Sequence, residues 1–410
     1  MINVNLLFII LAAVAFLGYV LTALFYKIKI AAVLPLMLIG LLLGPVLHVV
    51  NTSPNSTVIK LVPYVTALAV AFILFDVGFR IRISDLSLVY ASKFTFTLAT
   101  ITGLVLGFAI FVSLHLNILL SFAAGFGLAG PSAVVIPTVL KSAKINQRLK
   151  TTLNFESVVV DSVTLIVPIL LIEMLALNNI TTGGLLSLLE GFFVGSAILG
   201  IVSAFFWIFV LRYFKKYSEE YSWMLTITMV IATYGLAQQL GANGGMTIFI
   251  FGIMLANIPQ LNKWLSDYTQ EISKMLSHVS QYQKEITFFV STYLFVYIGL
   301  LFQISRQDYL LTFVALGLTI LIFYLRKLAL PLLSKMIEEQ TSNGPEHIAA
   351  EYSVARGMSP IVVATLPTAF GLYTPPQFIA VLFLTILFTN VLTTYGMYKF
   401  ANAVTARPKT

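Results

Sequence analysis

One aspartate lies in the middle of a long apolar stretch of the sequence. Asp161 comes ten residues after Thr151, where the stretch begins, or about 15 Å along a helix axis. A charged side chain at the centre of a bilayer costs roughly 2.5 to 3.5 kcal/mol on insertion scales, so its presence needs a reason. A buried carboxylate suits a hard monovalent cation, and burial also disfavours its charged form. The same oxygens could therefore hold either a cation or a proton, but not both.

Two hydroxyl side chains share the helix face of Asp161. Ser157 lies four residues before it and Thr164 three residues after it, and residues at these spacings are neighbours on a helix surface. We expect both to add neutral oxygen ligands to a cation at Asp161. The alternative is a structural carboxylate that pairs with a basic residue.

A second buried carboxylate lies close to the first along the chain. Glu156 is about 7.5 Å from Asp161 along the axis and about 140° around it, so the two cannot share one face. Arg356, in the middle of a later apolar stretch, is the simplest partner for a buried Glu. We therefore predict a structural ion pair between Glu156 and Arg356.

Asp76 is a third acidic candidate, near the end of another apolar stretch. Arg80 and Arg82 follow it, which fits a surface residue that sets membrane topology. It also fits a residue that lines the path of ions to the site. Nucleotide motifs, metal-ligand spacings and nucleophile–base pairs are absent from the sequence, so we expect neither an enzyme nor a cofactor.

The elements that must position these residues are membrane-spanning helices. Of the 410 residues, 59% are hydrophobic and only 10% are charged, with a mean hydropathy of +0.96. Apolar runs of about 20 residues recur along the chain, each long enough to cross a bilayer. The sequence therefore predicts an all-α polytopic membrane protein. It contains no Cys, which excludes disulfides.

We expect about thirteen transmembrane helices. They lie near residues 4–26, 30–50, 60–79, 88–114, 118–140, 151–177, 185–212, 221–240, 244–258, 285–304, 308–330, 346–370 and 376–400. Residues 259–284 are polar enough to form a surface helix or loop.

Positive charge is concentrated in alternate loops of this arrangement. One set of loops holds only Lys60 and Arg306, whereas the other holds nearly all remaining Lys and Arg. The positive-inside rule then places the N-terminus outside and the C-terminus in the cytoplasm. It also accounts for the net charge of +8 without a nucleic-acid partner. We expect one transmembrane domain over residues 1–403, a short cytoplasmic tail over 404–410, and no soluble regulatory domain.

The fifth and twelfth spans both contain a helix break. GPSAVVIP (130–137) and GMSPIVVATLP (357–367) each place Gly, Ser and Pro before a β-branched run and a second Pro. Proline frees a carbonyl that lipid cannot satisfy, so both breaks should face protein or a polar cavity. The two spans run antiparallel in the predicted topology. Paired interrupted helices indicate an inverted-repeat transporter with a midplane site, and ordinary proline kinks are the alternative.

Several segments resemble the monovalent cation:proton antiporter superfamily, in particular its sodium/proton exchanger domain, over nearly the whole chain. They are PLMLIGLLLGP (35–45), FILFDVGFRIRISDL (72–86), GPSAVVIP, FESVVVD (155–161), FFVSTYLFVYIGLLF (288–302) and VARGMSPIVVATLP (354–367). The chain departs from the family at two places. Val160 stands where Asn, Ser or a second Asp is usual, and Gly130-Pro131-Ser132 replaces the frequent Thr-Asp-Pro.

The resemblance implies a specific fold and cation site. Two six-helix inverted repeats would form a core domain and a dimerisation domain, with the broken fifth and twelfth spans crossing near the site. Asp161 would be the essential cation- and proton-binding aspartate, and Ser157 one of its ligands. Backbone oxygen near Gly130, with Ser132 close by, would complete the ligand set.

The resemblance also bears on the other charged residues. The family's structural Glu–Arg pair would fall on Glu156 and Arg356, and its acidic residue in the third span on Asp76. With Val160 in place of a second carboxylate, one proton should exchange for one cation.

We therefore expect an electroneutral antiporter that exchanges Na⁺, or K⁺ or Li⁺, for H⁺ as a homodimer in the plasma membrane. One alternative is a proton- or sodium-coupled symporter in which Arg356 binds a small organic anion. Another is a sensor or channel that reuses the fold.

Overall fold

The structure is a computed structural model, and nearly all of its described residues are helical. It describes residues 4–27, 33–50, 56–82, 89–133, 135–141, 145, 147–177, 182–213, 215–261, 269–302, 308–336 and 345–405. Within these ranges, six helices are long and apolar enough to cross a membrane. They contain residues Pro63–Arg80, Thr95–Leu114, Leu186–Leu211, Leu276–Leu301, Tyr309–Leu332 and Pro376–Val404. Shorter apolar helices accompany them.

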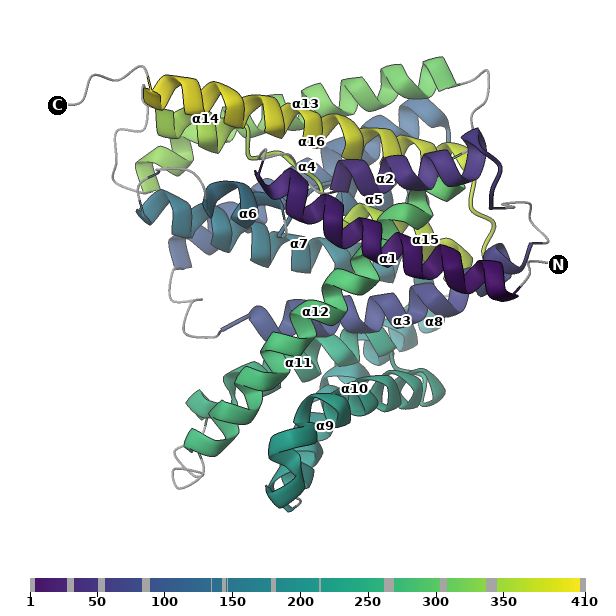
Figure 1. Cartoon of the computed structure of the whole chain (residues 1–410), viewed down its shortest axis with the longest axis vertical. Coiled ribbons are helices and arrows are strands. Elements are labelled where there is room, and N and C mark those ends of the chain that lie inside the picture. Colours follow the sequence, from purple (N-terminus) through teal and green to yellow (C-terminus); the bar gives the residue numbers. More distant parts are fainter. Residues whose placement is uncertain are drawn as a thin grey trace. The chain divides into compact units, whose positions relative to one another are not determined.

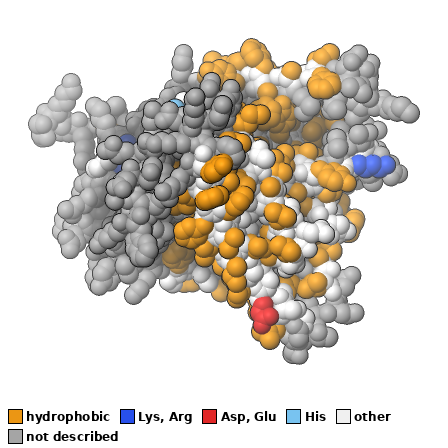
Figure 2. Space-filling view, turned by 90° about the horizontal axis from the view of Figure 1, so that it is seen from below, with side chains coloured by type: hydrophobic (Ala, Val, Ile, Leu, Met, Phe, Trp, Pro, Cys, Tyr) orange, Lys and Arg blue, Asp and Glu red, His pale blue; other side chains and the backbone are white. Residues whose placement is uncertain are grey.

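Large apolar side chains cover much of the described surface. Figure 2 shows one face on which hydrophobic side chains dominate the coloured area. Phe108, Phe209 and Phe313 each expose more than half of their surface. Such exposure suits contact with lipid, because a water-soluble protein rarely exposes extended apolar patches. The prediction of an all-α polytopic membrane protein is confirmed, whereas the number of thirteen spans stays a prediction.

The chain divides into two compact units. Most of the helices labelled in Figure 1 belong to the first unit. The first unit contains α1 (Val4–Lys27), α2 (Val33–Leu41), the π-helix η1 (Leu42–Val46), α4 (Val89–Leu114), α5 (Ile118–Gly127), α6 (Val135–Lys141), α7 (Gln147–Ala176), α13 (Asp308–Met336), α14 (Pro345–Glu351), α15 (Met358–Ala369) and α16 (Pro376–Thr405).

Close backbone contact joins α4 to α5 in the first unit. A Cβ atom built on Gly125 of α5 would lie 2.3 Å from the nitrogen of Gly107 and 2.4 Å from the carbonyl oxygen of Gly103, both in α4. Small residues four apart allow membrane helices to approach this closely. α5 packs against α7 and α7 against α15, while α13 contacts α4, α14 and α16. These contacts surround the residues that the sequence singled out in the first unit.

The second unit is a smaller bundle. It contains α8 (Thr182–Leu189), the π-helix η3 (Glu190–Gly195), α9 (Ser196–Tyr213), α10 (Lys215–Gln239) and α11 (Gly244–Leu261). Most of α3 (Thr57–Arg80) and the first part of α12 (Thr269–Leu301) also belong to it. Its core contains Phe75, Trp207 and Phe251, which are nearly fully buried.

The start of α12 differs from the expectation for residues 259–284. Residues 262–268 lie outside the described part of the chain, but α12 runs without a break from Thr269 into the predicted tenth span. Leu276, Val279 and Ile286 pack in the core of the second unit. Their spacing of three and seven residues puts them on one helix face, which the many polar residues between them conceal in the sequence.

Candidate functional site

Both predicted helix breaks interrupt helical structure in the first unit. Residues 128–134 separate α5 from α6, and residues 352–357 separate α14 from α15. The two connecting segments touch, because the backbone N–H of Ser132 donates to the carbonyl of Ala355 at 2.8 Å. Segments more than 200 residues apart in the sequence therefore meet at one place.

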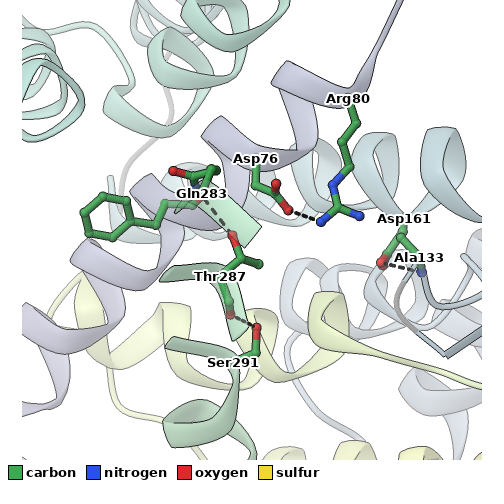
Figure 3. A network of polar contacts seen from close by, with 8 residues as sticks. Asp76, Arg80, Ala133, Asp161, Gln283, Thr287 and Ser291 are labelled. Carbon is green, nitrogen blue, oxygen red and sulfur yellow. Dashed lines mark hydrogen bonds and ion pairs between the residues drawn. The ribbon is translucent and has the colours of Figure 1, made fainter. Parts of the chain in front are cut away.

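The Asp161 carboxylate lies at this meeting point and is nearly fully buried. One carboxylate oxygen, Oδ2, accepts a hydrogen bond from the backbone N–H of Ala133 at 3.1 Å (Figure 3). The other, Oδ1, accepts one from the Ser359 hydroxyl. Ala133 lies just before α6, and Ser359 lies in the first turn of α15. Both donors thus belong to helix starts, where backbone N–H groups favour negative charge.

Gly130 and Thr164 lie beside Asp161. A Cβ atom built on Gly130 would lie 2.9 Å from the Thr164 hydroxyl oxygen and 3.1 Å from the Asp161 nitrogen. The Thr164 hydroxyl donates to the carbonyl of Val160 at 2.8 Å, so its oxygen lone pairs still have acceptor capacity. The structure brings these two predicted ligands together with the aspartate.

The two predicted serine ligands have different positions. The Ser132 hydroxyl accepts from the backbone N–H of Val135 at 3.2 Å, as a cap of α6. Ser157 is buried one turn before Asp161, and its hydroxyl donates to the carbonyl of Asn154 at 2.9 Å. Ser132 therefore orders the segment that carries Ala133, whereas Ser157 bonds within its own helix.

The two departures from the family pattern pack against each other. Val160 is buried, and its Cγ1 methyl would lie 3.0 Å from a Cβ atom built on Gly130. A larger residue at position 130 would collide with α7 at this point. The glycine and the valine are therefore compatible with each other, and the methyl group occupies space that a polar side chain would otherwise fill.

Glu156 forms its ion pair with Arg326 of α13. The prediction that Arg356 is the partner of Glu156 is therefore corrected to Arg326. The Arg326 guanidinium also donates through Nε to the carbonyl of Ala350 at 3.1 Å, which fixes its orientation. Packing of α13 buries Arg326, whereas the next residue, Lys327, is 60% exposed.

Arg356 remains close to this pair. It is buried in the segment between α14 and α15, and it interacts electrostatically with Arg326, Glu156 and Asp161. Among the described residues, its Nε atom has no hydrogen-bond partner. Two arginines and two carboxylates therefore form one buried charge cluster.

Asp76 belongs to the second unit. It is buried, and Arg80 donates to its Oδ2 atom at 2.5 Å (Figure 3). Thr287 of α12 adds a side-chain hydrogen bond, and Gln283 donates to the carbonyl of Phe72 at 3.0 Å. Burial and these contacts make a surface role at Asp76 the weaker of its two predicted roles.

Gly357 permits the contact between the two connecting segments. A Cβ atom built on it would lie 2.2 Å from the Ser132 hydroxyl oxygen and 2.8 Å from the Ser132 Cβ atom. Gly357→Ala should therefore push the two segments apart and lower transport at least severalfold in membrane vesicles. Gly317→Ala is the matched control, because a Cβ atom there meets nothing within 4 Å. Equal transport in the two variants would show that this contact is not needed.

Comparison with known proteins assigns this arrangement to a family. The sequence profile described as "Sodium/hydrogen exchanger, transmembrane" matches residues 12–397. The chain belongs to this family. The exchanger is also similar to two structures of the sodium proton antiporter MjNhaP1 from Methanocaldococcus jannaschii. One, determined at pH 8, has a TM-score of 0.71 at 20% identity and covers 96% of this chain and all of that one. The other, from electron microscopy, has a TM-score of 0.69 at 18% identity and covers both chains fully.

Three groups that contact Asp161 or Glu156 in the exchanger were not predicted from the sequence. They are the Ala133 amide, the Ser359 hydroxyl and the Arg326 guanidinium. Ser359 had a sequence signal, since it lies in the GMSP motif that mirrors Gly130-Pro131-Ser132. Ala133 had none, because a backbone donor carries no side-chain signature.

Proposed function

We propose that the exchanger is a secondary antiporter that exchanges Na⁺ for H⁺ at Asp161. The observation that carries this proposal is the buried Asp161 carboxylate, held by donors from the starts of two interrupted helices. Membership in a sodium/hydrogen exchanger family and similarity in fold to a sodium proton antiporter support it. The function is transport across a membrane, and we place it in the plasma membrane.

A single carboxylate accounts for the exchange. Asp161 carries a proton or a cation, and the bound state crosses by alternating access, in which the site opens to one side at a time. After Asp161 releases one ion and before it binds the other, the N–H of Ala133 and the hydroxyl of Ser359 stabilise its charged carboxylate. Since one positive charge replaces another, the exchange is electroneutral and one for one. We further propose a homodimer, with the N-terminus outside and the C-terminus in the cytoplasm.

The cation has a small set of oxygen ligands on this proposal. Asp161 supplies the charge, Ser157 and Thr164 supply hydroxyl oxygens, and Gly130 supplies a backbone oxygen next to Ser132. Hard monovalent cations accept such sets because they make few directional demands. Asp76 lines the path to this site on the same proposal. Na⁺ is the first candidate, and K⁺ and Li⁺ are the alternatives.

One observation favours the alternative of an organic-anion symporter. Glu156 pairs with Arg326, and Arg356 Nε has no hydrogen-bond partner among the described residues, so Arg356 could bind a carboxylate. The size of the adjacent cavity argues against that function. Its volume is about 20 Å³, which is room for about one water-sized molecule. An organic anion does not fit there, so we retain cation exchange.

Proton flux in proteoliposomes tests the proposed function. Na⁺, Li⁺ and K⁺ are added in turn to vesicles that contain the full chain, with and without a clamp on the membrane potential. We expect saturable proton movement opposite to Na⁺, with a rate that the clamp does not change. Proton movement that follows the clamped potential would exclude electroneutral exchange, and absence of movement with all three cations would exclude the function.

Ser359→Ala should weaken sodium binding without abolishing exchange. A hydrogen bond to a charged group contributes about 1.5 to 3 kcal/mol, so the KM for Na⁺ should rise by roughly tenfold or more. Thr365→Val is the matched control, because within the described part of the chain the Thr365 hydroxyl bonds to carbonyls of its own helix, α15. The prediction fails if both variants have the wild-type KM.

A further inference from the structure

A small cavity lies beside the cation site, on the Val160 side of α7. It is lined by α4, α7, α13 and the two connecting segments of the broken helices. Its polar lining consists of Thr95, Thr102, Glu156, Arg326, Ser353 and Arg356. All six side chains are at least nine-tenths buried. With a volume of about 20 Å³, it has room for about one water-sized molecule or ion.

The cavity is rich in hydrogen-bond donors. The described residues provide no partner for Arg356 Nε, Arg326 Nη2 or Glu156 Oε2. Two of these three atoms are guanidinium nitrogens, which can only donate. Thr95 and Thr102 add hydroxyls from α4. A buried polar group without a partner is destabilising, so a ligand with acceptor atoms would be stabilised here.

The charge of the surrounding cluster depends on the occupancy of Asp161. Arg356 interacts electrostatically with Arg326, Glu156 and Asp161. When Asp161 is charged and empty, two positive and two negative groups balance. When Asp161 carries a proton or a cation, the cluster has one excess positive charge. An uncompensated charge in a buried site is costly, and a water molecule cannot neutralise it.

We propose that this cavity binds a small monovalent anion such as chloride, and binds it more tightly when the charge of Asp161 is neutralised. Guanidinium groups are suited to this role because they stay charged and present several donors in a fixed geometry. The anion would keep the buried cluster neutral in both states of the site. This anion site depends on the proposed function in one respect, which is that a proton or Na⁺ is the ligand that neutralises Asp161.

Thermal unfolding of the purified full chain in detergent tests the anion site. Chloride is titrated against gluconate at constant ionic strength, with choline as the cation so that no sodium is present. Wild type should show a saturable rise of Tm with chloride. Asp161→Asn removes the charge permanently, so its half-saturation should fall to roughly a tenth of the wild-type chloride concentration, as expected for coupled sites. Direct binding of radioactive chloride should likewise be tighter in Asp161→Asn than in wild type.

Two cavity variants should weaken this response. Arg356→Gln should abolish the chloride-dependent rise, and Thr102→Val should shift it to higher concentration without changing any charge. Lys327→Gln is the matched control, because it removes a positive charge from an exposed neighbour of Arg326 and should respond like wild type.

The proposal is overturned if chloride and gluconate give the same Tm in wild type, in which case the cavity holds water only. It is also overturned if Arg356→Gln and Thr102→Val respond like wild type. Because this measurement involves no transport, chloride binding in a chain that fails to exchange Na⁺ for H⁺ would contradict the proposed function alone.

Discussion

Replacement of Asp161 by asparagine should abolish sodium-dependent proton movement in proteoliposomes while leaving the protein folded. Asparagine keeps the size of the side chain and can still accept from the Ala133 N–H, but it cannot take up a proton or balance a cation. Exchange should fall to the level of vesicles without protein. The elution volume and Tm of the purified variant should stay close to wild type.

Glu190→Gln is the matched control for this change. It makes the same carboxylate-to-amide substitution at an exposed position in η3, and it should exchange at the wild-type rate. Sodium-dependent proton flux retained by Asp161→Asn would show that another group carries the proton. A variant that loses flux because it unfolds would be recognised from its Tm and would call for Asp161→Ser as the second test.

Loss of the Arg326 guanidinium should strongly destabilise the protein. Arg326→Met keeps most of the side-chain volume but leaves the buried Glu156 without its ion-pair partner. Removal of one member of a buried pair typically costs about 3 to 5 kcal/mol, which should appear as a clear fall in Tm. Lys327→Met, one residue further along α13, should have a much smaller effect, because Lys327 is 60% exposed and its nitrogen lies 3.8 Å from the Glu351 carboxylate.

The double variant Arg326→Met/Glu156→Leu separates loss of a partner from loss of packing. Removal of both charges should recover much of the lost stability, since no unpaired buried charge then remains at this position. If Arg326→Met melts like wild type and Arg356→Met does not, then Arg356 is the main partner of Glu156, as the sequence had suggested. The two single variants therefore decide between the assignments.

Much of the fold could be predicted because lipid leaves a chain few choices. Backbone groups in a bilayer must be satisfied within the segment, so a long apolar run is a helix, and the span predicted over 376–400 lies within α16. The predicted span over 118–140 contains two helices because the chain is irregular around Gly130-Pro131-Ser132. The start of α12 was missed because its apolar residues, such as Leu276 and Val279, occupy only one face.

The candidate site was predictable only in part. Asp161 stands out because a carboxylate deep in an apolar run is rare, and helix geometry places Thr164 on its face. Ser359 is 198 residues away from Asp161, and serine is too common in membrane helices to indicate a contact. The choice between Arg326 and Arg356 depends on how α13 packs, and hydropathy carries no information on packing.

Proton release on sodium binding tests the shared site most directly. NaCl, with choline chloride as the control, is added to the purified chain in weakly buffered detergent solution, at a pH where Asp161 is protonated without sodium. A pH-sensitive dye follows the released protons. We predict one proton released for each Na⁺ bound by wild type and none by Asp161→Asn. Sodium binding without proton release, or equal release from wild type and Asp161→Asn, would contradict competition at this carboxylate.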